Sequence, residues 1–185
     1  MGSKPWYEAD TELYGKVKRE VEEAFPELRF INRGRDIVVT GYYPIYEGER
    51  VLDRYLVEVE PSKESPRGLP VVREVGGRIP LDRDRHINPE DGTACVVFPD
   101  AFWYENPDGM NLLEFLNRPL RSFFASQSLV ELGYTNPWPS GEWEHGVDGI
   151  IEFYGNLVGT RNPEIVWEYL RILKRELVKG HWSCP

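Results

Sequence analysis

Two β-rich runs separated by a short polar turn lie within residues 37–60, IVVTGYYPIYEGERVLDRYLVEVE. In the second run, residues 51, 53, 55, 57 and 59 share one face and are apolar except for Asp53. The alternate residues, including Arg54, Glu58 and Glu60, share the other face. Because successive side chains of a strand point to opposite faces, this alternation predicts a half-buried strand. The turn at residues 47–50 is short enough to join the two runs as an antiparallel hairpin.

Further elements extend this hairpin in both directions. Residues 28–31 predict a strand before it and residues 71–75 a short strand after it, so a meander of four antiparallel strands is the simplest arrangement. Residues 11–25 place apolar side chains on one stripe. That stripe predicts an amphipathic helix, capped by Asp10 or Thr11 and ending before Pro26.

Helical spacing returns towards the C-terminus. Residues 111–127 keep their phase through Pro119, which predicts one kinked helix or two abutting helices. Residues 150–154 fit either a short helix or a short strand, and a last helix is expected from Pro163, capped by Asn162, to Gly180. The expected fold class is α+β, with an N-terminal helix and C-terminal helices around the four-stranded antiparallel meander.

Length and composition indicate one soluble domain, residues 1–185. The net charge of -9, from 22 basic and 31 acidic side chains, provides no basic surface for nucleic acid and no attraction to anionic membranes. No apolar run is long enough to span a bilayer. Two cysteines make no disulfide framework and favour a reducing, cytoplasmic compartment. Neither a metal site nor a cofactor is expected, since the three histidines and two cysteines lack ligand spacing and no phosphate-binding loop is present.

The residues with most chemical potential lie in the segment 86–103, HINPEDGTACVVFPDAFW. A long irregular stretch and a polar turn lead to Cys95, and an apolar run follows it. A thiolate is a good nucleophile, so this cysteine suits acyl transfer through a thioester. A free cysteine also behaves as a small hydrophobic side chain, so a packed structural residue beside a turn fits equally well. The local residues leave both interpretations open.

Several motifs in this part of the chain resemble those of ubiquitin-conjugating (E2) domains. The tripeptide His86-Ile87-Asn88 is similar to the family's His-Pro-Asn, with isoleucine in the middle position. The run from Gly92 to Cys95 is similar to its step from glycine to the catalytic cysteine. Three further features occur in the same order along the chain as in the family. They are the strand YLVEV at 55–59 with the proline-bearing loop after it, then Trp103, and then Asn136-Pro137.

The resemblance implies a ubiquitin-conjugating (UBC-like) fold over roughly residues 10–180. It implies that Cys95 accepts an acyl group and passes it to an amine on a protein target, while Asn88 donates a hydrogen bond to the oxyanion and His86 braces the loop. The donor would be the C-terminus of a ubiquitin-like protein or of a nucleotidyltransferase. Because the chain has no nucleotide loop of its own, either an E1-type activating enzyme or an already activated donor is required.

The segment from 142 to 154 resembles bacterial relatives encoded in antiviral-defence (CBASS-like) operons, which act on the C-terminus of a signalling nucleotidyltransferase. It contains His145, flanked by Glu142, Glu144 and Asp148. This imidazole could take a proton from the attacking amine, or it could brace its loop.

Two other functions remain open at this point. A cysteine hydrolase using Cys95 and His145 would cleave a thioester or amide without an activating enzyme. A catalytically silent binding module of the same fold would simply bury Cys95 in its packing. Exposure of the Cys95 thiol separates the module from the two enzymes, because a buried thiol is inert.

Overall fold

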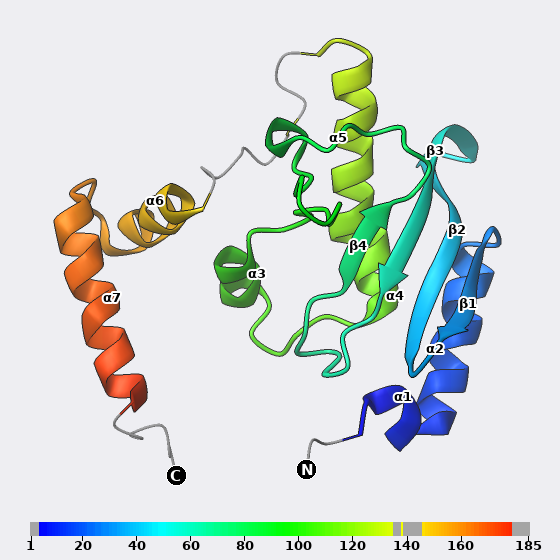
Figure 1. The fold of residues 1–185 in the computed structure, drawn as a ribbon, viewed down its shortest axis with the longest axis horizontal. Helices are drawn as coiled ribbons and strands as arrows, with labels where there is room; N and C mark the ends of the chain where they lie inside the picture. Colours follow the sequence, from blue (N-terminus) through cyan, green and yellow to red (C-terminus); the bar gives the residue numbers. More distant parts are fainter. Residues whose placement is uncertain (1–3, 135–137, 139–145, 179–185) are drawn as a thin grey trace. The chain divides into compact units, whose positions relative to one another are not determined.

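A computed structural model describes residues 4–134, 138 and 146–178 of the chain (Figure 1). These residues belong to two compact units, Met1–Pro139 and Ser140–Pro185, and each unit is described by itself. In the part of the chain that the structure describes, no helix is both long and apolar enough to cross a membrane.

The first unit is built on a four-stranded antiparallel sheet whose strands follow chain order (Figure 1). The strands are β1 (Leu28–Arg33), β2 (Asp36–Glu47), β3 (Arg50–Glu60) and β4 (Val71–Glu74). Phe30 pairs with Val39, Val39 with Val59, and Val59 with Val72, so one buried row crosses the whole sheet. The α+β class and the antiparallel meander are therefore confirmed.

The helices of this unit complete the core. They are α1 (Trp6–Ala9), α2 (Thr11–Ala24), α3 (Pro99–Glu105), α4 (Leu112–Phe115) and α5 (Arg121–Glu131), with the 3-10 turn η1 (Arg83–Arg85). The Asp10 carboxylate accepts the Leu13 N–H at 2.8 Å, as its expected capping role requires. Phe25, the C-cap residue of α2, stacks on Tyr43, and Phe124 of α5 stacks on Tyr55, so both helices are joined to buried tyrosines of the sheet.

The segment between α4 and α5 settles the question that Pro119 raised. Residues Leu116–Leu120 form a π-helical turn, η2, that links the two α-helices without interruption. Proline has no N–H to donate one turn back, and a widened turn accommodates that loss. The Tyr43 hydroxyl donates to the Leu116 carbonyl at 2.5 Å, so β2 ties this turn to the sheet.

The second unit is a helical hairpin of α6 (Val147–Val158) and α7 (Pro163–Val178). The segment around residues 150–154 is thus helical. Asn162 accepts the Glu164 N–H at 2.9 Å and Pro163 is the first helical residue, as expected. Gly155 lies against the connection: a Cβ placed there would be 2.7 Å from the carbonyl oxygen of Thr160. The expected end of the last helix at Gly180 is outside the described residues.

Candidate functional site

Cys95 lies on one arm of a short hairpin formed by residues 86–95. The Cys95 N–H donates to the His86 carbonyl, and the Asn88 N–H donates to the Thr93 carbonyl, each at 2.8 Å. Ile87 and Ala94 form a bridge between these two rungs. His86 and Cys95 are therefore directly opposite each other, and the backbone brings together three of the four residues proposed for the site.

This hairpin is attached to the sheet through its outer strand. The Ala94 N–H donates to the Val72 carbonyl at 2.8 Å, and Arg73 of β4 forms a bridge with Thr93. β4 is the last strand of the sheet, so its free edge would otherwise leave backbone groups unpaired. Cys95 therefore directly follows Ala94, the residue that is hydrogen-bonded to the edge of the sheet.

Side chains close the turn of the hairpin. Asn88 Oδ1 accepts the Glu90 N–H at 3.1 Å, and Asp91 Oδ1 accepts the Thr93 N–H at 3.0 Å and its hydroxyl at 2.7 Å. Gly92 has φ of 70°, a left-handed conformation that glycine adopts without steric cost. Hydrogen bonds lower the pKa of Asp91. The largest effect is that of the Thr93 side chain, the Thr93 N–H comes next, and the Asn88 side chain adds a smaller one. Asn88 is thus a turn residue whose carbonyl oxygen is already bonded.

The Cys95 thiol is exposed and makes no disulfide. Neighbouring atoms nevertheless shield its sulfur partly from water. This desolvation raises the pKa of Cys95, and the negative charge of Asp91 raises it further, as the smaller of the two causes. The thiol is therefore mostly protonated near neutral pH. A thiolate of raised pKa is intrinsically more nucleophilic but leaves a thioester more slowly than an acidic one.

His86, which lies opposite Cys95 in the hairpin, has a strained backbone conformation. It ends the η1 turn, with its N–H donating to Arg83 at 2.8 Å, and its φ is 53°. It is the one non-glycine residue with positive φ in the described segments 4–134, 138 and 146–178. Its ring meets Trp138 edge-on, with centroids 4.4 Å apart. These contacts favour the bracing role expected for His86.

A buried polar group on α5 holds the residue before His86, and the sequence did not point to it. Gln127 is fully buried. Its Oε1 accepts from Arg85 Nε and its Nε2 donates to the Arg85 carbonyl, both at 2.7 Å. Glu131, one turn further along α5, lies 3.7 Å from the same guanidinium. The run of polar residues Ser126, Gln127 and Ser128, followed by Glu131, in the second half of α5 is the signal that could have indicated this contact.

Helix α5 also holds the segment between β4 and η1, through a second arginine, Arg78. Arg78 donates to both carboxylate oxygens of Asp53 and to Glu131, and its guanidinium lies 4.4 Å from the centre of the Tyr55 ring. Ser128 also donates to Asp53, at 2.7 Å. Burial alone would raise the pKa of Asp53, but the hydrogen bonds from Arg78 and then Ser128 lower it to about 2. Burial raises the pKa of Tyr55 to about 12.

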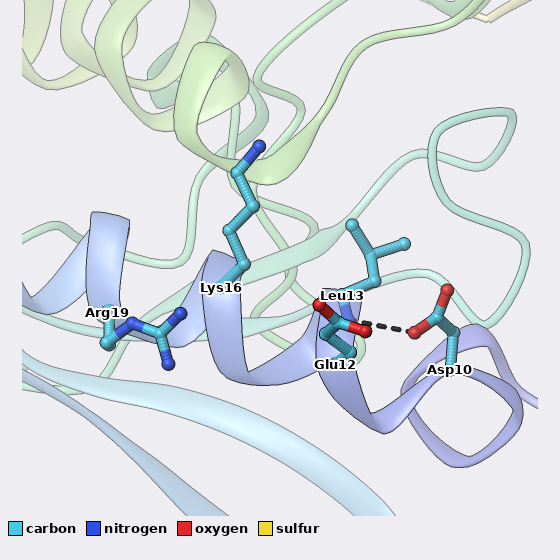
Figure 2. A pocket seen from close by; sticks show the side chains of 5 residues that line it. All are labelled: Asp10, Glu12, Leu13, Lys16 and Arg19. Carbon is cyan, nitrogen blue, oxygen red and sulfur yellow. Dashed lines mark hydrogen bonds between the residues drawn. The ribbon is translucent and has the colours of Figure 1, made fainter.

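A shallow depression of about 270 Å³ lies elsewhere, along helix α2 (Figure 2). It is lined by Asp10, Glu12, Leu13, Lys16 and Arg19. The Asp10 carboxylate is occupied with the Leu13 N–H, as the dashed line in Figure 2 shows. Of the expected site residues that the structure describes, which are His86, Asn88 and Cys95, none lines this depression, and we assign it no chemistry.

Other expected site residues fall outside the described part of the chain. These are His145, its neighbours Glu142 and Glu144, and Asn136-Pro137. Among the residues that are described, no three histidine, cysteine or acidic side chains gather in a way that could hold a metal ion.

The local chemistry is that of an exposed thiol, mounted on a hairpin that a sheet edge and helix α5 both hold. Such a thiol has the chemistry to accept an acyl group as a thioester. Comparison with known proteins finds no matching family model, curated protein or solved structure.

Proposed function

We propose that this chain is an E2-like conjugating enzyme of UBC-like fold. Cys95 would attack the activated C-terminal carbonyl of a donor protein, forming a carbon–sulfur bond as the activating group leaves with the electron pair of the broken bond and takes up the thiol proton. An amine of the target protein would then attack the thioester, the Cys95 thiolate would leave, and it would regain the proton that the amine loses. The observation that carries the proposal is the exposed Cys95 thiol on a hydrogen-bonded hairpin.

The exposure and raised pKa of the thiol favour this function over the two alternatives. A silent binding module has no need of an exposed cysteine at a braced turn. A cysteine hydrolase would need a base to activate this thiol, and its candidate base, His145, lies outside the described residues. The slow departure of such a thiolate suits a carrier, because the thioester persists until an amine arrives.

Asn88 fits the oxyanion role through the same contacts that make it a turn residue. Its Oδ1 is held by the Glu90 N–H at 3.1 Å, which fixes the plane of the amide. An amide held in this way loses little freedom when its Nδ2 donates to an oxyanion on the thioester carbon. The turn uses Oδ1 and one N–H of Nδ2, which donates to Asp91, so the second N–H of Nδ2 remains for the oxyanion and the two roles are compatible.

The donor must arrive activated. The sequence has no nucleotide-binding loop, so an E1-type enzyme or a preformed thioester would supply the energy. We propose a ubiquitin-like protein or the C-terminus of a bacterial antiviral signalling nucleotidyltransferase as the donor, in keeping with the resemblance of its motifs.

Intact-mass measurement tests the proposal directly. The chain is incubated with each candidate donor, with and without ATP and the activating enzyme, and the adduct is challenged with excess thiol. We expect a thiol-labile adduct on the wild-type chain, a thiol-resistant ester on Cys95→Ser, and none on Cys95→Ala. An adduct that persists in Cys95→Ala would refute the proposal, and donor cleavage without transfer to amine would establish the hydrolase instead.

A further inference from the structure

The contacts between helix α5 and the residue that precedes the hairpin of residues 86–95 point to one additional functional residue. We propose that Gln127 is a positioning residue: it holds Arg85 and, through the backbone of His86, sets the place of the Cys95 thiol. This inference rests on the proposed function for its catalytic consequence, but the position of the thiol can be measured without any donor.

The first step is the pairing of Gln127 with Arg85. Gln127 is fully buried, and both ends of its amide bond to Arg85: Oε1 accepts from the side chain and Nε2 donates to the main chain, each at 2.7 Å. Two bonds to one residue fix both its side-chain direction and its peptide plane. A buried amide has few alternative partners, so the arrangement is strongly determined.

The second step carries this restraint to the thiol. Arg85 precedes His86, whose left-handed φ of 53° must be maintained by surrounding contacts because it is disfavoured for a residue with a Cβ. The His86 carbonyl accepts the Cys95 N–H at 2.8 Å. A change in the Arg85 peptide plane therefore reaches Cys95 across one peptide unit and one hydrogen bond.

The restraint has a catalytic consequence. Catalysis by orientation depends steeply on geometry, and a displacement of about 1 Å can cost on the order of 10²-fold in rate. The surroundings of the thiol depend on the same placement, since partial desolvation by neighbouring atoms and then the charge of Asp91 raise the pKa of Cys95. Loosening the hairpin should expose the sulfur to water and slow directed transfer at the same time.

The variant Gln127→Met keeps the volume and removes both bonds, whereas Gln127→Glu keeps the Oε1 acceptor and removes the donor. Val21→Ala, a truncation of a fully buried residue on α2, is the control for lowered stability. All are made in Cys184→Ser, so that one thiol reports. Alkylation by iodoacetamide is followed from pH 6 to 11, and melting temperature and thioester discharge to amine are measured in parallel.

We expect Gln127→Met to move the midpoint of the alkylation profile to lower pH and to slow discharge at least roughly tenfold. Gln127→Glu should lie between it and the wild type, and Val21→Ala should keep the wild-type profile despite a lower melting temperature. If Gln127→Met does not fold, Gln127→Glu is compared with wild type alone. A wild-type alkylation profile in a folded Gln127 variant would overturn the inference. Failure of the wild type to load any donor would count against the proposed function only, since alkylation still reports on the thiol.

Discussion

Replacing Arg78 by methionine removes the charge that holds the loop of residues 76–86 to β3 and α5. In the folded chain, hydrogen bonds lower the pKa of Asp53 from its ordinary 3.8 to about 2. A shift of that size corresponds to about 2.4 kcal/mol, at 1.36 kcal/mol per unit. Ser128 and the Arg54 N–H supply part of it, and Arg78 is 36% exposed, so screening reduces its share. We assign Arg78 about 1–2 kcal/mol, plus ~0.5–1 kcal/mol for its contact with the Tyr55 ring.

The sign of the pH dependence follows from the lowered pKa. A carboxyl whose folded pKa lies below its unfolded value stabilises the fold above pH 3.8, and that contribution is lost as the pH falls through about 2. Without Arg78, only Ser128 and the Arg54 N–H would oppose the effect of burial, so the pKa of Asp53 would rise towards its ordinary value and its carboxylate would stabilise the variant less at neutral pH. The loss should be largest at pH 7 and should shrink near pH 2.5.

Urea unfolding of the wild type and Arg78→Met at pH 7, 4 and 2.5 measures this difference. Asp53→Asn and the double variant complete a cycle that isolates the coupling between the two side chains. Lys16→Met, which removes an exposed cation from α2, is the matched control and should change stability by less than about 0.5 kcal/mol. Equal losses for Arg78→Met at pH 7 and 2.5, or a loss below about 0.5 kcal/mol at pH 7, would refute this account of the cluster.

Three other perturbations test separate parts of the structure. Leu120→Ala removes a fully buried side chain and should cost about 2–5 kcal/mol in urea unfolding, and a smaller loss would contradict the placement of this residue in the core. Gly155→Ala places a Cβ 2.7 Å from the Thr160 carbonyl and should cost about 1–3 kcal/mol, visible as reduced helicity and melting temperature; an unchanged melting curve would argue against that close approach. Asp91→Asn removes a negative charge that raises the pKa of Cys95, so alkylation at pH 8 should become faster, and the gain should diminish in high salt. An unchanged alkylation rate would mean that Asp91 does not act on the thiol.

Most of the sheet and the helix starts were predictable because they depend on local patterns. The alternation in residues 51–60 predicted the apolar face of β3, of which Tyr55, Val57 and Val59 are buried, whereas Val51 at the hairpin end is exposed. Asp10 and Asn162 could be identified as caps because a capping side chain bonds to an N–H two or three residues away. Helix α3 was missed because Pro99 follows an apolar run that resembles a strand as much as a helix start.

Cys95 could be selected from the sequence because it is an interior thiol beside a polar turn, but the geometry around it could not. The hairpin of residues 86–95 is held by backbone bonds to Val72, and backbone groups carry no trace in the amino-acid pattern. The stretch before Cys95 therefore looked irregular, although it contains the η1 turn and one arm of a hairpin. His86 has an unusual φ that no residue pattern announces.

By itself, the sequence determined the order of the four strands and the positions of helices α2 and α7, because strand and helix periodicity and end caps act over a few residues. Tertiary packing alone determined which polar side chains of α5 form hydrogen bonds with the segment that leads to His86. Gln127 reaches Arg85 across 42 positions, and Arg78 reaches Glu131 across 53. A polar side chain that becomes buried needs a partner, and the fold supplies that partner from whichever distant segment packs against it.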